Sequence, residues 1–290
     1  MHTLGETLIV LLNIKELRVY MIKLFAKRYF MWLSLISVLV LCVPNAQSND
    51  RELYRNALKS YEWLLQNLLR QNLVDYSYLK KNQSILNHYV YVVGRTSYDD
   101  LQQAEQLAFV INAYNAFVLR LVLDYWPHIR SMNDIPDFPL PRRWKDQRWM
   151  FDGKRVSLND LKHNYLRPLK NPIAYFSLFC GAASCPDLQP TLYRAAIIDK
   201  QLDESVKIFL SKKKGLQWRM SDPLVRKPKP MVFVSELFRK DEDVFIANGY
   251  TILAFVEEFA PQGFKAFLNS HRDQVELKYL SFDWDVNAIR

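Results

Sequence analysis

Residues 1–48 differ in character from the rest of the chain, and they determine the cellular compartment in which the rest folds. From Met21 a basic start precedes an uncharged apolar run, residues 29–43, and small residues follow at Ala46 and Ser48. This order is typical of a secretory signal, and the apolar run is shorter than the roughly 20 residues that a helix needs to cross a membrane. We therefore expect an upstream extension and a signal peptide over residues 1–48, with the signal starting at Met21 and cleavage near Ser48. The alternative is an uncleaved anchor in the inner membrane.

Export would determine the chemistry of the cysteines. Cys42 leaves with the signal, so the exported chain keeps only Cys180 and Cys185, five residues apart. In an oxidising compartment, the periplasm or the exterior, a disulfide between the two is the default expectation. The spacing is not that of a zinc finger or of a thioredoxin-type pair.

The exported part predicts one globular domain over residues 49–290. Half of the chain's residues are apolar and 14% are aromatic, which is enough for a sizeable core, and no linker or internal repeat interrupts this part. The net charge of +9 is mild for 290 residues and does not indicate a nucleic-acid partner. Contact with a membrane is expected only through an uncleaved signal.

The pattern of apolar residues predicts a helix-rich α+β domain with a small, mostly antiparallel sheet. Three- and four-residue spacing and end signals predict helices at residues 51–71, 78–92, 97–125 and 195–212, with one or two more at 251–267. Asp152-Gly153 predicts a hairpin turn between strands at 148–151 and 155–157. Further strands are expected at residues 173–179, 217–220, 231–234 and 277–284.

The strongest chemical signal lies where the apolar segment 173–179 meets the sequence Cys180-Gly-Ala-Ala-Ser-Cys185-Pro. A turn of this kind presents two sulfurs and several backbone N–H groups, as a thiol nucleophile with an oxyanion site requires. The alternative is a small structural disulfide that closes a loop. Both interpretations stay open at this point.

His163 follows Asp160 by three residues in a segment that Ser157 caps. On a helical wheel Asp160, His163 and Arg167 share the face opposite the apolar stripe, so Asp160 could orient His163 as a general base. A histidine that is simply solvated at the surface is the equal alternative.

Asn112 and Asn115 lie three residues apart on a helix that is apolar nearly all round. Buried amides must find hydrogen-bond partners, so the structural interpretation is that they tie loop backbone to this helix. The functional interpretation is a contact with an oxyanion or a substrate. Tyr114, Arg167 and Ser184 are the further candidates for ligand contacts.

Several familiar signatures are missing from the sequence. It has no glycine-rich phosphate loop, no H-E-x-x-H and no G-x-S-x-G. A metal site from His163, Cys180 and Cys185 would lack a fourth ligand. We therefore expect no cofactor and no metal.

Four blocks of the chain resemble the domain of unknown function 547 family, which occurs in many exported or lipid-anchored bacterial proteins. They are residues 108–116, 157–167, 176–188 and 280–287. The resemblance implies a shared fold but no activity, since none is agreed for the family. Plant-like members keep a residue like Cys180 more often than one like Cys185, so the resemblance favours Cys180 as the nucleophile if there is one.

Two functional hypotheses follow, and the sequence leaves open whether there is any catalysis. The first is an exported domain whose cleft, lined by Asn112, Asn115, His163 and the Cys180 turn, binds a small molecule or a peptide. The alternative is a cysteine-dependent hydrolase or acyltransferase. In that case Cys180, or alternatively Cys185, attacks, His163 moves the proton, Asp160 orients His163 and Asn115 stabilises the oxyanion.

Overall fold

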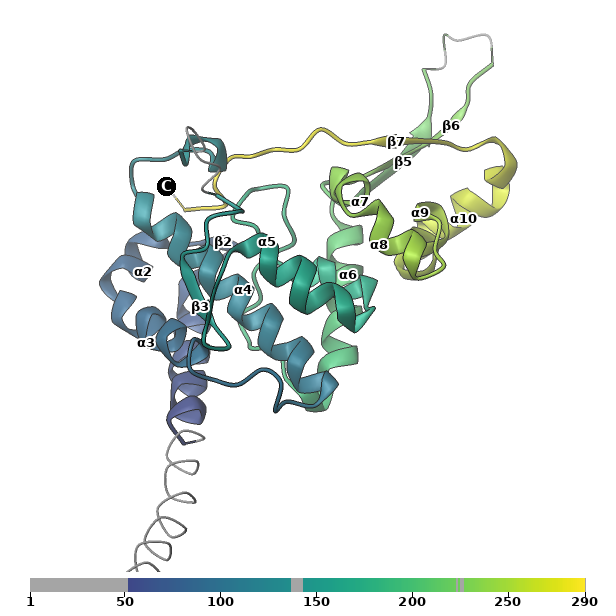
Figure 1. The fold of residues 1–290 in the computed structure, drawn as a ribbon. Helices are drawn as coiled ribbons and strands as arrows, with labels where there is room; N and C mark the ends of the chain where they lie inside the picture. The colour runs from purple at the N-terminus through teal and green to yellow at the C-terminus, as the bar shows by residue number, and fades with distance from the viewer. Residues whose placement is uncertain (1–51, 137–142, 223, 225–226, 290) are drawn as a thin grey trace, which may run out of the picture. The chain divides into compact units, whose positions relative to one another are not determined.

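The fold is described from a computed structural model, which places residues 52–136, 143–222, 224 and 227–289 (Figure 1). The chain divides into two units, residues 1–53 and 54–290, and the described residues belong almost wholly to the second. The predicted signal and its cleavage site lie outside the described residues. Within the second unit the buried apolar side chains form two clusters.

The first cluster begins with the helix of residues 52–68. Its buried side chains follow the three- and four-residue spacing that predicted it, namely Ala57, Tyr61, Leu64, Leu65 and Leu68. The helix ends where strand β1 (Leu69–Arg70) turns into its antiparallel partner β2 (Leu73–Val74).

The helix predicted at 78–92 is two helices, α2 (Tyr76–Lys81) and α3 (Gln83–Val93). The interruption falls at Asn82, whose side-chain amide donates to the Tyr78 carbonyl at 2.9 Å. An asparagine that binds a carbonyl four residues back competes with the helical backbone, and it ends α2 here.

Helix α4 (Gln103–Tyr125) is the centre of the first cluster. It starts later than residue 97 because Gln102 and Glu105 form a capping box, in which the Glu105 carboxylate accepts from the Gln102 N–H at 3.0 Å. Its predicted end, before Pro127, is confirmed. Among the described residues it is the one helix long and apolar enough to cross a membrane, but 89% of its most apolar 18-residue window is buried inside the fold.

The hairpin and the capped segment after it are confirmed. Strands β3 (Trp149–Phe151) and β4 (Lys154–Val156) pair across Asp152 and Gly153, which both adopt positive φ, 52° and 69°. Ser157 then caps α5 (Leu158–Asp160), but the chain continues as a π-helix over Leu161–Leu166 and a short 3₁₀ turn over Arg167–Leu169.

The strand predicted at 173–179 is wrong, because residues Pro172–Ser177 form a 3₁₀-helix. The Asn171 side chain caps this helix by accepting from the Ala174 N–H, and Pro172 starts it. The segment is apolar throughout because it lies between the clusters: Phe176 belongs to the second cluster, whereas Tyr175 and Phe179 belong to the first. A short run buried on all sides has no period that distinguishes strand from helix.

The second cluster contains the three-stranded sheet and the later helices. Strands β5 (Leu216–Met220) and β6 (Pro230–Val234) pair antiparallel, and β7 (Glu276–Tyr279) joins β6 in parallel. The helices are α6 (Ile198–Ser211, after a 3₁₀ turn over Ala195–Ile197), α7 (Glu236–Lys240), α8 (Glu242–Ala247), α9 (Ile252–Phe259) and α10 (Gln262–His271). The sequence predicted these elements except α7 and α8, and the strand predicted at 277–284 ends at Tyr279. The helix-rich α+β class is confirmed. The described residues form three small sheets instead of the one expected, and their strands pair antiparallel except for β6 with β7.

After β7 the chain returns to the first cluster, as the yellow segment of Figure 1 shows. There the Val286 N–H donates to the Arg130 carbonyl at 2.8 Å, and the Asn287 N–H donates to the Gly181 carbonyl at 2.9 Å. The Asn287 carbonyl accepts from the Val74 N–H at 3.2 Å. The last residues therefore join three segments that are far apart in the sequence.

Candidate functional site

Asn112 and Asn115 both bind loop backbone from helix α4. The Asn112 amide donates to the Tyr193 carbonyl at 2.8 Å and accepts from the Tyr193 N–H at 3.0 Å. Asn115 does the same for the segment at 177–179, donating to the Ser177 carbonyl at 3.0 Å and accepting from the Phe179 N–H at 2.8 Å. Each amide thus supplies the donor and the acceptor that a neighbouring strand would supply in a sheet. This is the role that the structural interpretation expected.

Cys180 and Cys185 form a disulfide, with their Cα atoms 5.5 Å apart. The two sulfur-bearing residues differ in access, since Cys185 is fully buried and Cys180 is partly exposed. While the sulfurs are joined neither is a thiolate, so the hydrolase hypothesis requires a reduced form of the protein. Ser184, a predicted ligand contact, is buried in the same turn, where its hydroxyl accepts from the Asp283 N–H at 2.8 Å.

Two residues after the turn, the largely buried side chain of Asp187 lies between two lysines. Lys214 donates to its carboxylate at 2.7 Å, and Lys212 forms a second, shorter ion pair. Burial alone would raise the pKa of Asp187, but the hydrogen bonds from Lys212 and Lys214 lower it below the usual value. The Lys214 ammonium also donates to the Ala183 carbonyl at 3.1 Å, so this charged group supports the turn that carries the disulfide.

His163 and Asp160 are not arranged as a dyad. The Asp160 carboxylate accepts from the N–H and the hydroxyl of Ser157, both at 2.8 Å, so it completes the capping box. Burial would raise the pKa of Asp160, but these bonds lower it. His163 is exposed, and its ring forms no hydrogen bond within the described part of the chain. Arg167 forms an exposed ion pair with Asp243 of α8.

Two candidate residues, Tyr114 and Cys180, do line one small pocket, of about 40 Å³, at the junction of the two clusters. Lys162 and Asp241 also line it and form a largely buried ion pair at 2.8 Å, and the Lys162 ammonium lies 5.3 Å from the centre of the Tyr175 ring. Burial, and then the charge of Asp241, raises the pKa of Tyr114. The phenol therefore stays neutral and is able to donate a hydrogen bond.

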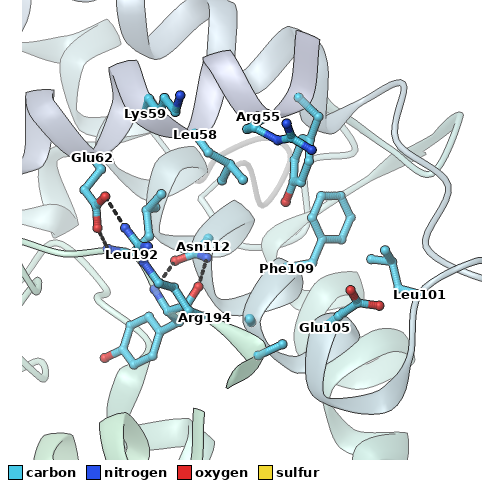
Figure 2. A pocket seen from close by; sticks show the side chains of 14 residues that line it. Arg55, Leu58, Lys59, Glu62, Leu101, Glu105, Phe109, Asn112, Leu192 and Arg194 are labelled. Atoms are coloured by element: carbon cyan, nitrogen blue, oxygen red, sulfur yellow. Dashed lines mark hydrogen bonds and ion pairs between the residues drawn. The ribbon is translucent and has the colours of Figure 1, made fainter. Parts of the chain in front are cut away.

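A larger cavity, of about 340 Å³, lies beside α4, the helix of residues 52–68 and the loop at 192–195 (Figure 2). Its volume is at the lower end of the roughly 300–1,000 Å³ typical of ligand sites. The walls are mostly apolar and include Leu58, Leu101, Ala108, Phe109 and Leu192. Of the predicted site residues, Asn112 is the one that lines this cavity.

The loop that closes the cavity is fixed from two sides, as the dashed lines of Figure 2 show. Glu62 accepts from the Leu192 N–H at 3.3 Å and pairs with Arg194, while Asn112 holds Tyr193 from the opposite side. Because both clamps are side chains on helices, the cavity is a preformed feature of the fold.

Among the residues that the structure describes, some charged side chains at the cavity have hydrogen-bond or ion-pair partners, and others do not. Glu62 is paired with Arg194, and Glu105 caps its own helix. Arg55 and Lys59, both exposed at the rim, form no ion pair within the described ranges. Burial, and then the nearby Glu105, raises the pKa of Tyr54, so its hydroxyl stays protonated beside this rim. The cavity thus combines an apolar interior with two unpaired cations at its mouth.

The sequence did not indicate this cavity, because its parts are far apart in the chain. Tyr54 and Leu58 were the available signal: they widen the apolar stripe of the first helix, and in the structure they are only partly buried against the first cluster and also line the cavity. Lys162 was also missed, although it stands next to His163, and the reason is local geometry. A π-helix has more residues per turn than the wheel assumes, so it changes which neighbours face inward. Among the described residues no group of three His, Cys, Asp or Glu is placed to hold a metal.

Residues 98–210 match the model of a family described as a protein of unknown function, DUF547. The resemblance proposed from the sequence is therefore confirmed over the first three of its four blocks, and the fourth lies beyond the match. No curated protein and no solved structure matches the chain. The match carries no activity with it, so a function must be argued from the site.

Proposed function

We propose that this protein is an exported binding protein whose cavity beside α4 takes a small ligand with an apolar body and an acidic group. The observation that carries the proposal is the pairing of a preformed apolar cavity with Arg55 and Lys59 at its mouth. An apolar body would displace water from the walls, and an acidic group would meet the two cations. No catalytic group is required for this function.

The binding proposal is tested with decanoate as the acidic amphiphile and decanol as its uncharged analogue, each measured by displacement of anilinonaphthalene sulfonate. Replacing Arg55 and Lys59 together by alanine is expected to weaken decanoate binding about fivefold, because exposed charge pairs contribute modestly. Decanol binding should not change. Leu58→Trp, which fills the cavity, should abolish binding of both.

The matched control replaces Lys200 and Lys207, two exposed lysines of α6, by alanine. This variant loses the same charge elsewhere and should bind decanoate like the unaltered protein. If the Arg55/Lys59 variant and Leu58→Trp both bound decanoate as tightly as the unaltered protein, the ligand would lie elsewhere and the proposal would be overturned.

The location of the protein is part of the same proposal and rests on the signal pattern of residues 21–48. We expect the protein recovered from the periplasm or the medium to begin at Asn49, as its intact mass and N-terminal sequence would report. Full-length protein retained in the membrane fraction, still carrying Met21, would instead support an uncleaved anchor.

A further inference from the structure

We propose that Cys180 and Cys185 form a redox-active disulfide that oxidises a dithiol, and that Cys180 is the sulfur the incoming thiolate attacks. The proposal rests on the turn at residues 180–185 and is independent of the ligand cavity. Three features of the turn carry it: unequal access to the two sulfurs, a donor aimed at one of them, and a backbone that is held without the disulfide.

The first feature is access. Thiol–disulfide exchange requires a thiolate to reach one sulfur of the pair, and the rate depends on which sulfur is accessible. Cys185 is 0% exposed, whereas Cys180 is partly exposed and lines the small pocket with Lys162 and Tyr175. A thiolate that approaches the folded protein therefore meets Cys180. Lys162 in the same pocket is paired with Asp241, so access and not charge distinguishes the two sulfurs.

The second feature is the support of the leaving sulfur. The Ala182 N–H donates to Cys185 Sγ at 3.3 Å. Sulfur in a disulfide is a weak acceptor, and the same sulfur as a thiolate is a strong one, so this bond strengthens as Cys185 leaves. Gly181 makes the geometry possible, because its φ of 81° suits glycine and a Cβ there would lie 2.8 Å from Met132 Sδ.

The third feature is that the backbone of the turn is held by the C-terminal segment. The Ala183 N–H donates to the Asp285 carbonyl at 2.8 Å, and the Ser184 N–H donates to the Asp283 carbonyl at 3.2 Å. A disulfide that closes so short a loop restricts the unfolded chain least. We therefore expect the turn to keep these backbone partners when the disulfide is reduced.

The exchange is balanced in two steps. A substrate thiolate attacks Cys180, the Cys180–Cys185 bond breaks, and Cys185 leaves as a thiolate with the electron pair. The second thiol of the substrate, as a thiolate, then attacks the substrate sulfur bound to Cys180 and releases Cys180 as a thiolate. The substrate ends as a disulfide and the protein as a dithiol. Two electrons pass to the protein, and the two protons of the substrate thiols end on Cys180 and Cys185.

The test uses the full chain with Cys42→Ser, so that only the pair can react. The folded protein is treated with dithiothreitol or with reduced thioredoxin, alkylated and weighed, while near-ultraviolet circular dichroism follows the tertiary fold. We expect both thiols to appear while the tertiary signal is unchanged. The faster of the two reagents distinguishes a small dithiol from a protein dithiol as the source. Thiols that appear only as the tertiary signal is lost would overturn the proposal.

The attacked sulfur is identified with two matched variants in the same background. The Cys180 thiol in Cys185→Ser is expected to react with Ellman's reagent about tenfold faster or more than the Cys185 thiol in Cys180→Ser. In the unaltered pair, glutathione should be trapped on Cys180 by peptide mass. Equal rates, or an adduct on Cys185, would contradict the assignment, and the dithiothreitol measurement remains decisive if either variant fails to fold.

Discussion

Asn115→Ala is expected to lower the free energy of unfolding by about 4 kcal/mol, measured by urea denaturation, because two buried hydrogen bonds are lost at once. The Ser177 carbonyl and the Phe179 N–H would both remain buried, and each would be left without the amide that now satisfies it. A buried backbone group without a partner costs more than a hydrogen bond contributes when it forms.

Asn67→Ala is the matched control. Asn67 also lies on a helix, and its amide donates to the Trp63 carbonyl one turn earlier at 2.8 Å, but this bond is exposed and local. Water replaces such a partner, so we expect a change within about 0.5 kcal/mol. Equal effects of the two alanine substitutions would show that Asn115 does not anchor the segment at 177–179.

Asn115→Asp separates the two bonds. Aspartate has the same shape and still accepts from the Phe179 N–H, but its carboxylate cannot donate to the Ser177 carbonyl. Burial against a carbonyl would raise the pKa of this carboxyl above its unfolded value. Stability relative to the unaltered protein should therefore be lowest at neutral pH and partly recover as the pH falls through the raised pKa, where the protonated group donates. Loss that is independent of pH would contradict this account.

Elements defined by neighbouring residues were predictable from the sequence. The Asp152-Gly153 turn fixes its hairpin by the positive φ that both positions adopt, and Ser157 with Asp160 fixes the start of α5. The buried amides of Asn112 and Asn115 were predictable for a similar reason, since a polar side chain within an apolar helix must find a partner. None of these inferences requires knowledge of distant parts of the chain.

Elements defined by distant residues were not predictable. The apolar segment 173–179 suggested a strand, but no strand in the described part of the chain pairs with it; Asn115, more than 60 residues earlier, supplies its backbone partner. The pairing of Asp160 with His163 assumed an ordinary α-helix, whereas the chain forms a π-helix from Leu161 and the Asp160 carboxylate is hydrogen-bonded to Ser157. The cavity depends on Glu62 meeting Arg194, 132 residues away.

The second expected result concerns residues 98–210, the part of the chain that the family model covers. We expect this segment alone to show no cooperative unfolding transition by circular dichroism in urea, whereas residues 49–290 should show one. The segment contains α4 and the disulfide turn, but it lacks three groups of contacts that the structure gives them. Each group buries a surface that would otherwise face water.

The N-terminal losses are the helices before residue 98. The helix of residues 52–68 buries four large side chains in the first cluster, Tyr61, Leu64, Leu65 and Leu68, and α2 and α3 both contact α4. The C-terminal losses are the tail, which bonds the turn through Asp285 and Asn287, and the second cluster. Without the second cluster, α6 would expose Val206, Phe209 and Leu210, each of which contributes roughly 1.5–3 kcal/mol when fully buried. These losses together approach or exceed the 5–15 kcal/mol by which a typical domain is stable.

Two longer segments show which of these contacts the fold requires. Residues 49–212 restore the first helix but not the tail or the second cluster, and residues 98–290 restore the tail and the second cluster but not the first helix. Because α4 is the centre of the first cluster and receives contacts from both sides, we expect neither to unfold cooperatively. A cooperative transition in residues 98–210 would mean that the matched segment is a domain in itself. The flanking helices and tail would then be additions to it and not parts of its core.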